Sequence, residues 1–277
     1  MQPAPPPPVL VAGDAQAIPT WRAAWSDRTG ALMAALCELA YADRATVANG
    51  VRGAGFRICG WYDLDGLTAF LAVNPAEMAV LVFRGTADRQ GWADDLDALR
   101  IPLPGHPDVE VHAGFWHAWD AMAAAIHAGV DALPPDLGLY VAGHSLGGAM
   151  AQLAAMALER DTLAACYTFG SPRLATAGFD ALLKTEHYRV VHEWDLVPAV
   201  PPATPWGYAH SGDPRLLSSL APACALRRDR GLVARVLVDL WSLVVWQLTG
   251  RFAAVDDHMI WKYRAALQGV AALRSAP

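Results

Sequence analysis

One segment of the chain changes from a strand pattern to a helical pattern through a serine flanked by glycines. Residues 137–145 form a nearly continuous apolar run, and residues 146–160 then carry apolar residues at helical spacing. Gly143, Ser145 and Gly147 form the G-x-S-x-G turn at the junction. The glycines relieve crowding in a sharp turn, so the serine is expected in a strained conformation with its hydroxyl pointing away from the sheet. This strand, turn and helix constrain the fold more than any other segment.

The other apolar runs extend the same order along the chain. Strands are predicted at 56–63, 67–75, 78–85, 165–172 and 188–195, and helices at 26–43 and 113–132. Alternation of strands and helices indicates parallel crossovers, so we expect a three-layer α/β fold with a mostly parallel central sheet. A flexible Pro-rich segment is expected at 1–20, followed by a single domain at 21–277.

The composition limits the classes of partner. A net charge of −6 argues against nucleic acid, whose binding needs a basic surface. The four cysteines have no C-x-x-C spacing, and Asp256-Asp257-His258 has no second cluster to complete a metal site, so no metal or other cofactor is expected. The N-terminus lacks the features of a signal peptide, which predicts a cytoplasmic location by default, or a secreted one if a leader has been removed.

The glycine-flanked serine needs partners if it is to act as a nucleophile. A serine hydroxyl is weakly nucleophilic at neutral pH, so a base must take its proton and an acid must orient that base. For a nucleophile on this turn, the order along the chain is serine, acid, histidine. Asp195 follows an apolar strand, at the end where open α/β sheets have their sites. His210 and His258 follow it, and both remain candidates for the base.

Several segments match, in order, those of the fungal-type class 3 lipases of the α/β-hydrolase superfamily. They are FRGT (83–86), the Trp92…Asp95-Leu96 spacing, VHAGFWHAW (111–119), GHSLGGAMAQLAA (143–155), TFGSPR (168–173), DLVPAVPP (195–202), GYAH (207–210) and DHMIWKY (257–263). The chain therefore resembles that family over about residues 79–264. It departs from the family at the end, because family members more often have a shorter spacing between the last histidine and the tyrosine.

The resemblance implies which residues carry the chemistry. Ser145 is implied as the nucleophile, Asp195 as the acid and His258 as the base, with the counterpart of His210 structural. The oxyanion hole is implied to consist of the backbone N–H groups of Leu146 and Thr86, with the Thr86 hydroxyl in support. An ordinary loop threonine is the alternative for Thr86.

Residues 87–101 are the candidate for a helical lid. They mix charged with apolar residues, so one face can cover an acyl pocket and then face lipid when the lid opens. A plain connecting helix is the alternative. Asp95 is expected to steady the lid through a charged partner, or else to be a solvated carboxylate. The larger apolar residues of the segment are Trp92, Leu96, Leu99 and Ile101.

The segment 232–248 is unusually apolar for its place between the acid and the base. A membrane span is disfavoured because Arg235 and Asp239 fall within it. Two interpretations remain. The helix either packs beside His258 and completes the wall of an acyl pocket, or docks on lipid next to the lid.

Together these features predict a serine hydrolase that cleaves carboxylic esters, acylglycerols above all. A phospholipase A1 or a feruloyl-type esterase would use the same residues with a different pocket, and a non-catalytic lipid-binding protein would keep the fold alone. The expected partners are ester or lipid substrates, with peripheral contact to a lipid interface through the lid and residues 232–248. The oligomeric state is left open.

Overall fold

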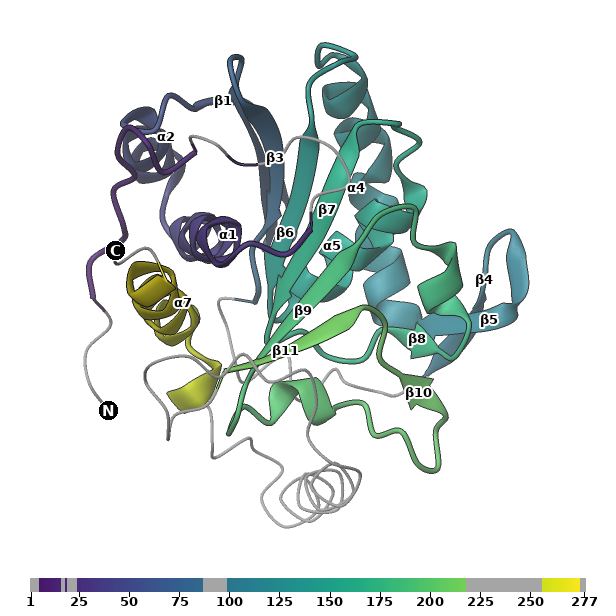
Figure 1. The fold of residues 1–277 in the computed structure, drawn as a ribbon. Coiled ribbons are helices and arrows are strands. Elements are labelled where there is room, and N and C mark those ends of the chain that lie inside the picture. Colours follow the sequence, from purple (N-terminus) through teal and green to yellow (C-terminus); the bar gives the residue numbers. More distant parts are fainter. Residues whose placement is uncertain (1–4, 16–17, 19–23, 87–98, 218–255, 275–277) are drawn as a thin grey trace.

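A seven-stranded sheet forms the centre of the protein (Figure 1). The computed structural model describes residues 5–15, 18, 24–86, 99–217 and 256–274. The strands, in spatial order, are β1 (Arg57–Leu64), β2 (Leu67–Asn74), β3 (Met78–Phe83), β6 (Leu139–His144), β7 (Leu163–Phe169), β9 (His187–His192) and β11 (Asp213–Leu217). The first three strands pair antiparallel, and every pairing from β3 to β11 is parallel, which confirms the predicted mostly parallel sheet.

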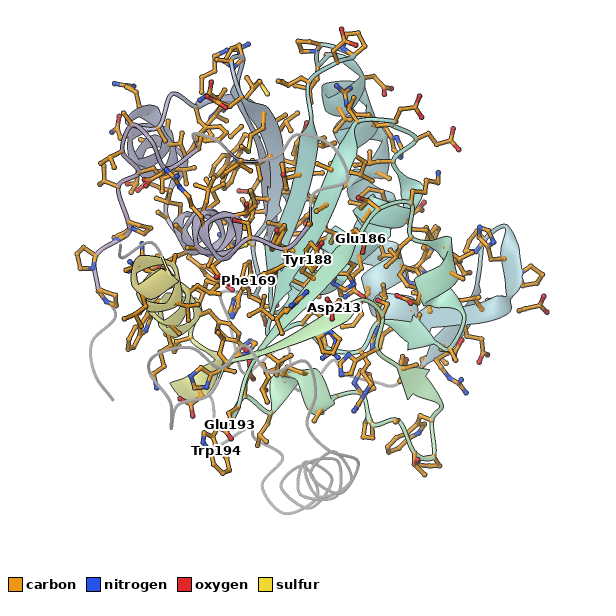
Figure 2. All side chains as sticks on the ribbon, viewed as in Figure 1. Phe169, Glu186, Tyr188, Glu193, Trp194 and Asp213 are labelled. Carbon is orange, nitrogen blue, oxygen red and sulfur yellow. The ribbon has the colours of Figure 1, made fainter. Side chains whose placement is uncertain are left out.

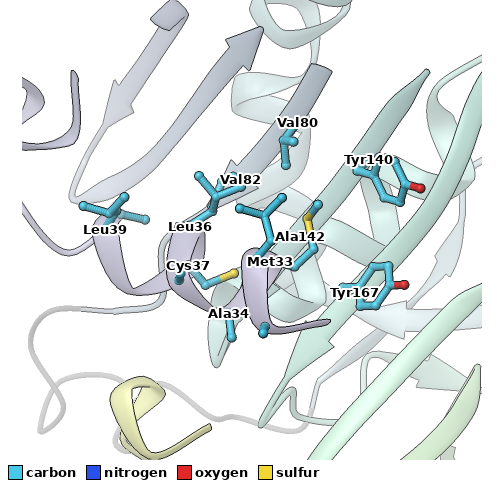
Figure 3. Close-up of a cluster of buried hydrophobic side chains, with 14 of the residues drawn as sticks. Met33, Ala34, Leu36, Cys37, Leu39, Val80, Val82, Tyr140, Ala142 and Tyr167 are labelled. Atoms are coloured by element: carbon cyan, nitrogen blue, oxygen red, sulfur yellow. The ribbon is translucent and has the colours of Figure 1, made fainter. Parts of the chain in front are cut away.

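Helices cover both faces of this sheet and complete three layers. One face carries α1 (Asp27–Leu39), α2 (Arg44–Arg52) and α7 (Ile260–Arg274). The other face carries α4 (Ala113–Asp131) and α5 (Leu146–Ala157). Successive strand residues point to opposite layers, so Val80 and Val82 pack with α1 (Figure 3), whereas Leu81 packs with the α4 and α5 side. The predicted α/β class is confirmed.

The helix predicted at 26–43 is shorter in the structure. It ends at Leu39, and a second helix begins at Arg44. Asp43 caps the second helix, because its carboxylate accepts a hydrogen bond of 2.9 Å from the Thr46 N–H. The prediction was therefore wrong for residues 40–43, where the apolar pattern continues although the helix does not.

The sequence patterns miss a second, four-stranded sheet. In spatial order its strands are β10 (Tyr208–Ala209), β8 (Ala175–Thr176), β5 (His106–His112) and β4 (Arg100–Leu103). The last two strands form an antiparallel hairpin in which Ile101 pairs with Val111. The lid candidate at 87–101 is therefore too long, because its last two residues belong to a strand.

Two segments with specific predictions lie outside the described residues. The first is 87–98, which contains Trp92, Asp95 and Leu96, and the second contains the apolar stretch 232–248. Among the helices that the structure does describe, none combines the length and the apolar character needed to cross a membrane.

Part of the N-terminal segment expected to be flexible is packed on the body. Leu10, Ala15 and Ile18 are buried in the same cluster as α1 and α7. The Leu10 N–H donates a hydrogen bond of 2.8 Å to the carbonyl oxygen of Gly50, at the end of α2. The prolines at 5–8 remain partly or fully exposed.

Candidate active site

Ser145 forms the turn between β6 and α5. Its backbone has a φ of 58° and a ψ of −130°, a conformation that residues other than glycine rarely adopt. Such strain costs about 1–3 kcal/mol, and it persists where the surroundings hold the residue in place. Here the Ser145 N–H donates a hydrogen bond of 2.9 Å to the Phe169 carbonyl oxygen at the end of β7. The strained conformation predicted from G-x-S-x-G is present.

The glycines of the turn are required by close backbone packing. A Cβ on Gly143 would lie 1.9 Å from the Gly147 carbonyl oxygen, and one on Gly147 would lie 2.3 Å from the carbonyl oxygen of Phe83 in β3. Both contacts are with backbone, which cannot move aside. The turn is therefore clamped between its own helix and the neighbouring strand.

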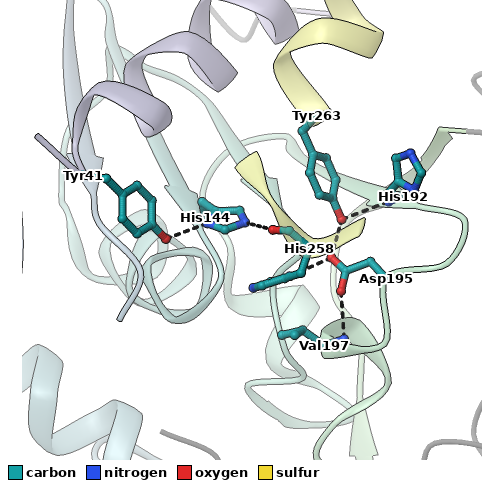
Figure 4. A network of polar contacts seen from close by, with 7 residues as sticks. All are labelled: Tyr41, His144, His192, Asp195, Val197, His258 and Tyr263. Carbon is teal, nitrogen blue, oxygen red and sulfur yellow. Dashed lines mark hydrogen bonds and ion pairs between the residues drawn. The ribbon is translucent and has the colours of Figure 1, made fainter. Parts of the chain in front are cut away.

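Asp195 and His258 form a buried pair (Figure 4). His258 Nδ1 lies 2.8 Å from Asp195 Oδ2, and the two residues are 7% and 2% exposed. The same Oδ2 accepts a hydrogen bond of 2.5 Å from the Tyr263 hydroxyl, and Oδ1 accepts one of 2.9 Å from the Val197 N–H. The carboxylate is thus held by a histidine, a tyrosine and a backbone N–H.

The pairing with Asp195 fixes which nitrogen of His258 can act as a base. A carboxylate accepts hydrogen bonds, so Nδ1 carries the proton and the lone pair of the neutral ring lies on Nε2. Nε2 is buried and has no hydrogen-bond partner within the described ranges. A histidine whose Nδ1–H binds a carboxylate and whose Nε2 is unprotonated can take a proton from a serine hydroxyl.

The serine and the pair converge on the carboxyl ends of β7 and β9. Gly170 follows Phe169, and its φ of 56° allows the chain to pass beside the pair. A Cβ at this position would lie 2.6 Å from Asp195 Oδ2 and 2.9 Å from His258 Nδ1. In Figure 2, β9 leads to Glu193 and to Trp194, which is 59% exposed, and Asp195 follows directly.

The surroundings of Ser145 also contain the two residues implied for an oxyanion hole. Leu146 is the first residue of α5, where backbone N–H groups have no partner within the helix. Thr86 follows Gly85, and a Cβ added to Gly85 would lie 2.8 Å from Ser145 Cβ. The Thr86 hydroxyl is buried and has no hydrogen-bond partner in the part of the chain that the structure describes. Both residues therefore lie near Ser145 along the chain or through Gly85.

The structure does not bring His210 to Asp195. His210 follows β10 and lines a small cavity together with Gln152 and Asp180, on the side of the second sheet. Burial, and then the charges of Arg189 and Arg173, lower its pKa well below the usual value. Of the two histidines, His258 has the orienting acid, so the geometry favours it as the base.

Cysteine and metal chemistry find no support at this site. The three cysteines in the described part of the chain are free thiols, and burial raises the pKa of each. A raised pKa disfavours the reactive thiolate. The described ranges contain no group of three His, Cys, Asp or Glu side chains that could hold a metal ion. Asp257 instead forms an ion pair with Lys262 at 3.0 Å.

Gly170 and Tyr263 both lie in segments that the sequence analysis noted, but the sequence does not reveal their contacts with Asp195. Gly170 lies in the TFGSPR segment, but its closeness to Asp195 depends on how β7 and β9 pair. Tyr263 lies five residues after His258, and its hydrogen bond to Asp195 depends on the direction in which α7 leaves the site. These contacts join residues far apart in the chain.

Comparisons with known proteins agree with this geometry. The family model described as Lipase (class 3) matches residues 80–204. The secreted mono- and diacylglycerol lipase 1 of Fusarium solani is 35% identical over 154 residues, which cover 53% of this chain and 46% of that protein. A lipase of Rhizomucor miehei is 31% identical over 167 residues, which cover 56% and 46%. The resemblance to fungal-type class 3 lipases is confirmed, and the chain spans about half the length of these curated relatives.

Solved structures give the same fold. A triacylglycerol lipase whose catalytic centre is described as a serine protease triad superposes with a TM-score of 0.63 at 26% identity, over 72% of this chain and 83% of that chain. A fungal lipase–inhibitor complex gives a TM-score of 0.57 at 25% identity, over 70% and 79%. Because the Fusarium relative is described as secreted, the comparisons do not support the cytoplasmic default.

The contact between Gly170 and the Asp195–His258 pair can be tested by adding a methyl group. Gly170→Ala should slow the reaction of Ser145 with a fluorophosphonate by about 10–100-fold, because a displaced base no longer activates the serine. Gly178→Ala is the matched control. It also has a positive φ, 105°, but its Cβ would contact only Val109 Cγ2, at 3.3 Å.

The control should lower the melting temperature and leave the labelling rate unchanged. Equal labelling rates for the two variants, measured by the mass gain of the Ser145 peptide, would show that Gly170 does not constrain the pair.

Proposed function

We propose, from the class 3 lipase region that this chain carries at residues 80–204, that the protein is a serine hydrolase of carboxylic esters and that acylglycerols are its substrates. One observation carries the proposal. The Asp195–His258 pair is buried with Nε2 free of hydrogen-bond partners among the described residues, and Ser145 is held in a strained turn at a helix N-terminus. This set of groups suits acyl transfer through a covalent intermediate.

In the proposed reaction His258 acts first as a base and then as an acid. Its Nε2 takes the proton of Ser145 Oγ while Oγ attacks the ester carbonyl carbon. The tetrahedral intermediate collapses when the proton passes to the leaving alcohol, and an acyl group remains on Ser145. Water then attacks the acyl-enzyme, again with His258 as the base, and the carboxylic acid leaves.

The negative oxygen of the intermediate needs donors that are already in place. We propose the backbone N–H groups of Thr86 and Leu146 for this role, with the Thr86 hydroxyl as a further donor. The unpartnered, buried state of that hydroxyl supports the assignment. Asp195 holds His258 in the required tautomer and stabilises the imidazolium that forms after proton transfer.

Acylglycerols are favoured as substrates by the relatives. One is described as a mono- and diacylglycerol lipase, and a structural neighbour is described as a triacylglycerol lipase.

We further propose that Trp92, Asp95 and Leu96 belong to a lid and that residues 232–248 contact lipid. Relatives described as secreted support action outside the cell, which recovery of the protein solely from the cell pellet of its source organism would contradict.

A panel of esters tests the function and its substrate class together. The purified protein should hydrolyse emulsified triolein faster than phosphatidylcholine or methyl ferulate. Ser145→Ala and His258→Ala should each lower kcat by about 10⁴–10⁶-fold, and the double variant should lose no more, because the two residues act as a unit. A faster rate on phosphatidylcholine or methyl ferulate would reassign the substrate.

His210→Ala is the control for the base in the same panel. It should retain kcat, because His210 lies on the side of the second sheet. An inactive His210→Ala protein together with an active His258→Ala protein would overturn the assignment of the base.

The ratio of rates on emulsified and dissolved esters in a Trp92→Ala variant tests the lid in turn, and equal losses on both would count against it.

Removing the Thr86 hydroxyl tests the oxyanion hole. Thr86→Val keeps the shape and the backbone N–H, and it should lower kcat by about 10²–10³-fold with little change in KM, because the donor acts on charge that develops in the transition state. Steady-state kinetics on a dissolved short-chain ester measure both constants. A higher KM with unchanged kcat would show instead that Thr86 contacts the substrate in its ground state.

A further inference from the structure

His144 is the residue immediately before the nucleophile, and its side chain is tied at both ring nitrogens. Nδ1 lies 2.7 Å from the Tyr41 hydroxyl, which comes from the end of the α1 segment. Nε2 lies 2.7 Å from the backbone carbonyl oxygen of His258. Figure 4 shows this chain of contacts running from Tyr41 through His144 to the candidate base.

Hydrogen-bond chemistry fixes the roles in this chain of contacts. The carbonyl of His258 can only accept, so Nε2 of His144 carries a hydrogen and donates. In a neutral ring the lone pair then lies on Nδ1, and the Tyr41 hydroxyl donates to it. Both bonds of the neutral ring are satisfied in a single tautomer.

The two histidine rings also pack against one another. Their centroids lie 4.6 Å apart with an interplanar angle of 32°, and the Tyr263 ring stands edge-on to His144 at 6.1 Å. His144 is 4% exposed, so its contacts form in a well-packed environment. The ring therefore restricts the base in two ways, by holding its main chain and by packing beside its imidazole.

His258 is thus held from two independent directions. Asp195 holds its ring through Nδ1, and His144 holds its main chain through the carbonyl oxygen. The second contact has a special consequence because His144 and Ser145 are adjacent in the chain. Any displacement of the turn moves the nucleophile and the support of the base together, although His144 and His258 are 114 residues apart.

We propose that His144 is a positioning residue that sets the distance between Ser145 and His258, and that Tyr41 holds His144 in the tautomer that does so. The inference rests on the proposed serine hydrolase function and adds a role that the reaction itself does not require. His144 need not touch the substrate. If His144 only stabilised the fold, any side chain that satisfied the neighbouring hydrogen bonds could replace it. A positioning role requires in particular a donor that bonds to the His258 carbonyl oxygen.

Two amide substitutions test the roles of the two ring nitrogens of His144 separately. His144→Gln places an amide N–H near the position of Nε2 and keeps a donor for the His258 carbonyl. His144→Asn places its amide near the position of Nδ1, which keeps a partner for Tyr41 but loses that donor. His144→Leu removes both. His187→Asn is the control, since His187 is equally buried, lies at the start of β9 and bonds to Thr168 of β7.

The primary readout is the rate at which a fluorophosphonate labels Ser145, because labelling depends on the base and needs no ester. His144→Asn and His144→Leu should be slower than wild type by about 10–100-fold, and His144→Gln should recover most of the rate. Tyr41→Phe should slow labelling by about two- to tenfold. On a dissolved ester the losses should fall on kcat, with KM unchanged. The His187→Asn control should lower the melting temperature and leave the labelling rate unchanged.

Equal rates for the Gln and Asn variants would overturn the proposal, and so would losses that follow the melting temperatures of all five variants. Failure of the proposed function is a separate result. A wild-type protein that is labelled at Ser145 but cleaves no ester would contradict ester hydrolysis, while the order of the Gln and Asn rates would still decide the role of His144. A wild-type protein that is not labelled at Ser145 would overturn both.

Discussion

Asp195 is 2% exposed, and its carboxylate accepts hydrogen bonds from His258, Tyr263 and the Val197 N–H. A buried charge is tolerated when donors surround it, and removing one donor from a buried group costs about 1–3 kcal/mol, more for a charged one. The donors come from three places: the 3₁₀ helix η2 (Val197–Ala199), the 3₁₀ helix η3 (Asp256–His258) and α7. The carboxylate therefore joins the end of the sheet to the last helix. The position of His258 depends on this connection.

The nucleophile depends on a second constraint, which is the close packing of backbone around Ser145. Gly143 and Gly147 let the turn approach β3, and the hydrogen bond to Phe169 ties it to β7. The strain at Ser145 is maintained because three strands of the central sheet hold the turn. His144 then links the turn to the main chain of His258, so both constraints meet at the base.

The central part of the fold could be predicted because its signals are local. Apolar runs separated by helical periods predict β3, β6, β7, β9 and α5, and the glycines around Ser145 predict the turn. The hairpin of β4 and β5 was missed because Pro102 and Pro107 interrupt its alternation. The break at Asp43 was missed because the apolar pattern continues past the end of α1.

The site was predictable in part for a similar reason. Asp195 follows from its place after a strand, whereas the order of residues leaves His210 and His258 equivalent. Their difference arises from three-dimensional contacts, since one reaches Asp195 and the other faces the second sheet. The hydrogen bonds of Tyr41 and Tyr263 were not predicted because their partners lie far away in the sequence. The assignments at 87–98 and 232–248 remain predictions.

The central claim is that Ser145 carries the acyl group during ester cleavage. It is tested most directly by mixing the protein with a dissolved p-nitrophenyl ester, quenching in acid before steady state and mapping the adduct by mass spectrometry. The account predicts a mass gain of one acyl group on the peptide that contains Ser145, formed as the first nitrophenol is released and absent from Ser145→Ala. Release of nitrophenol by Ser145→Ala at the wild-type rate, or an acyl group on another residue, would contradict it.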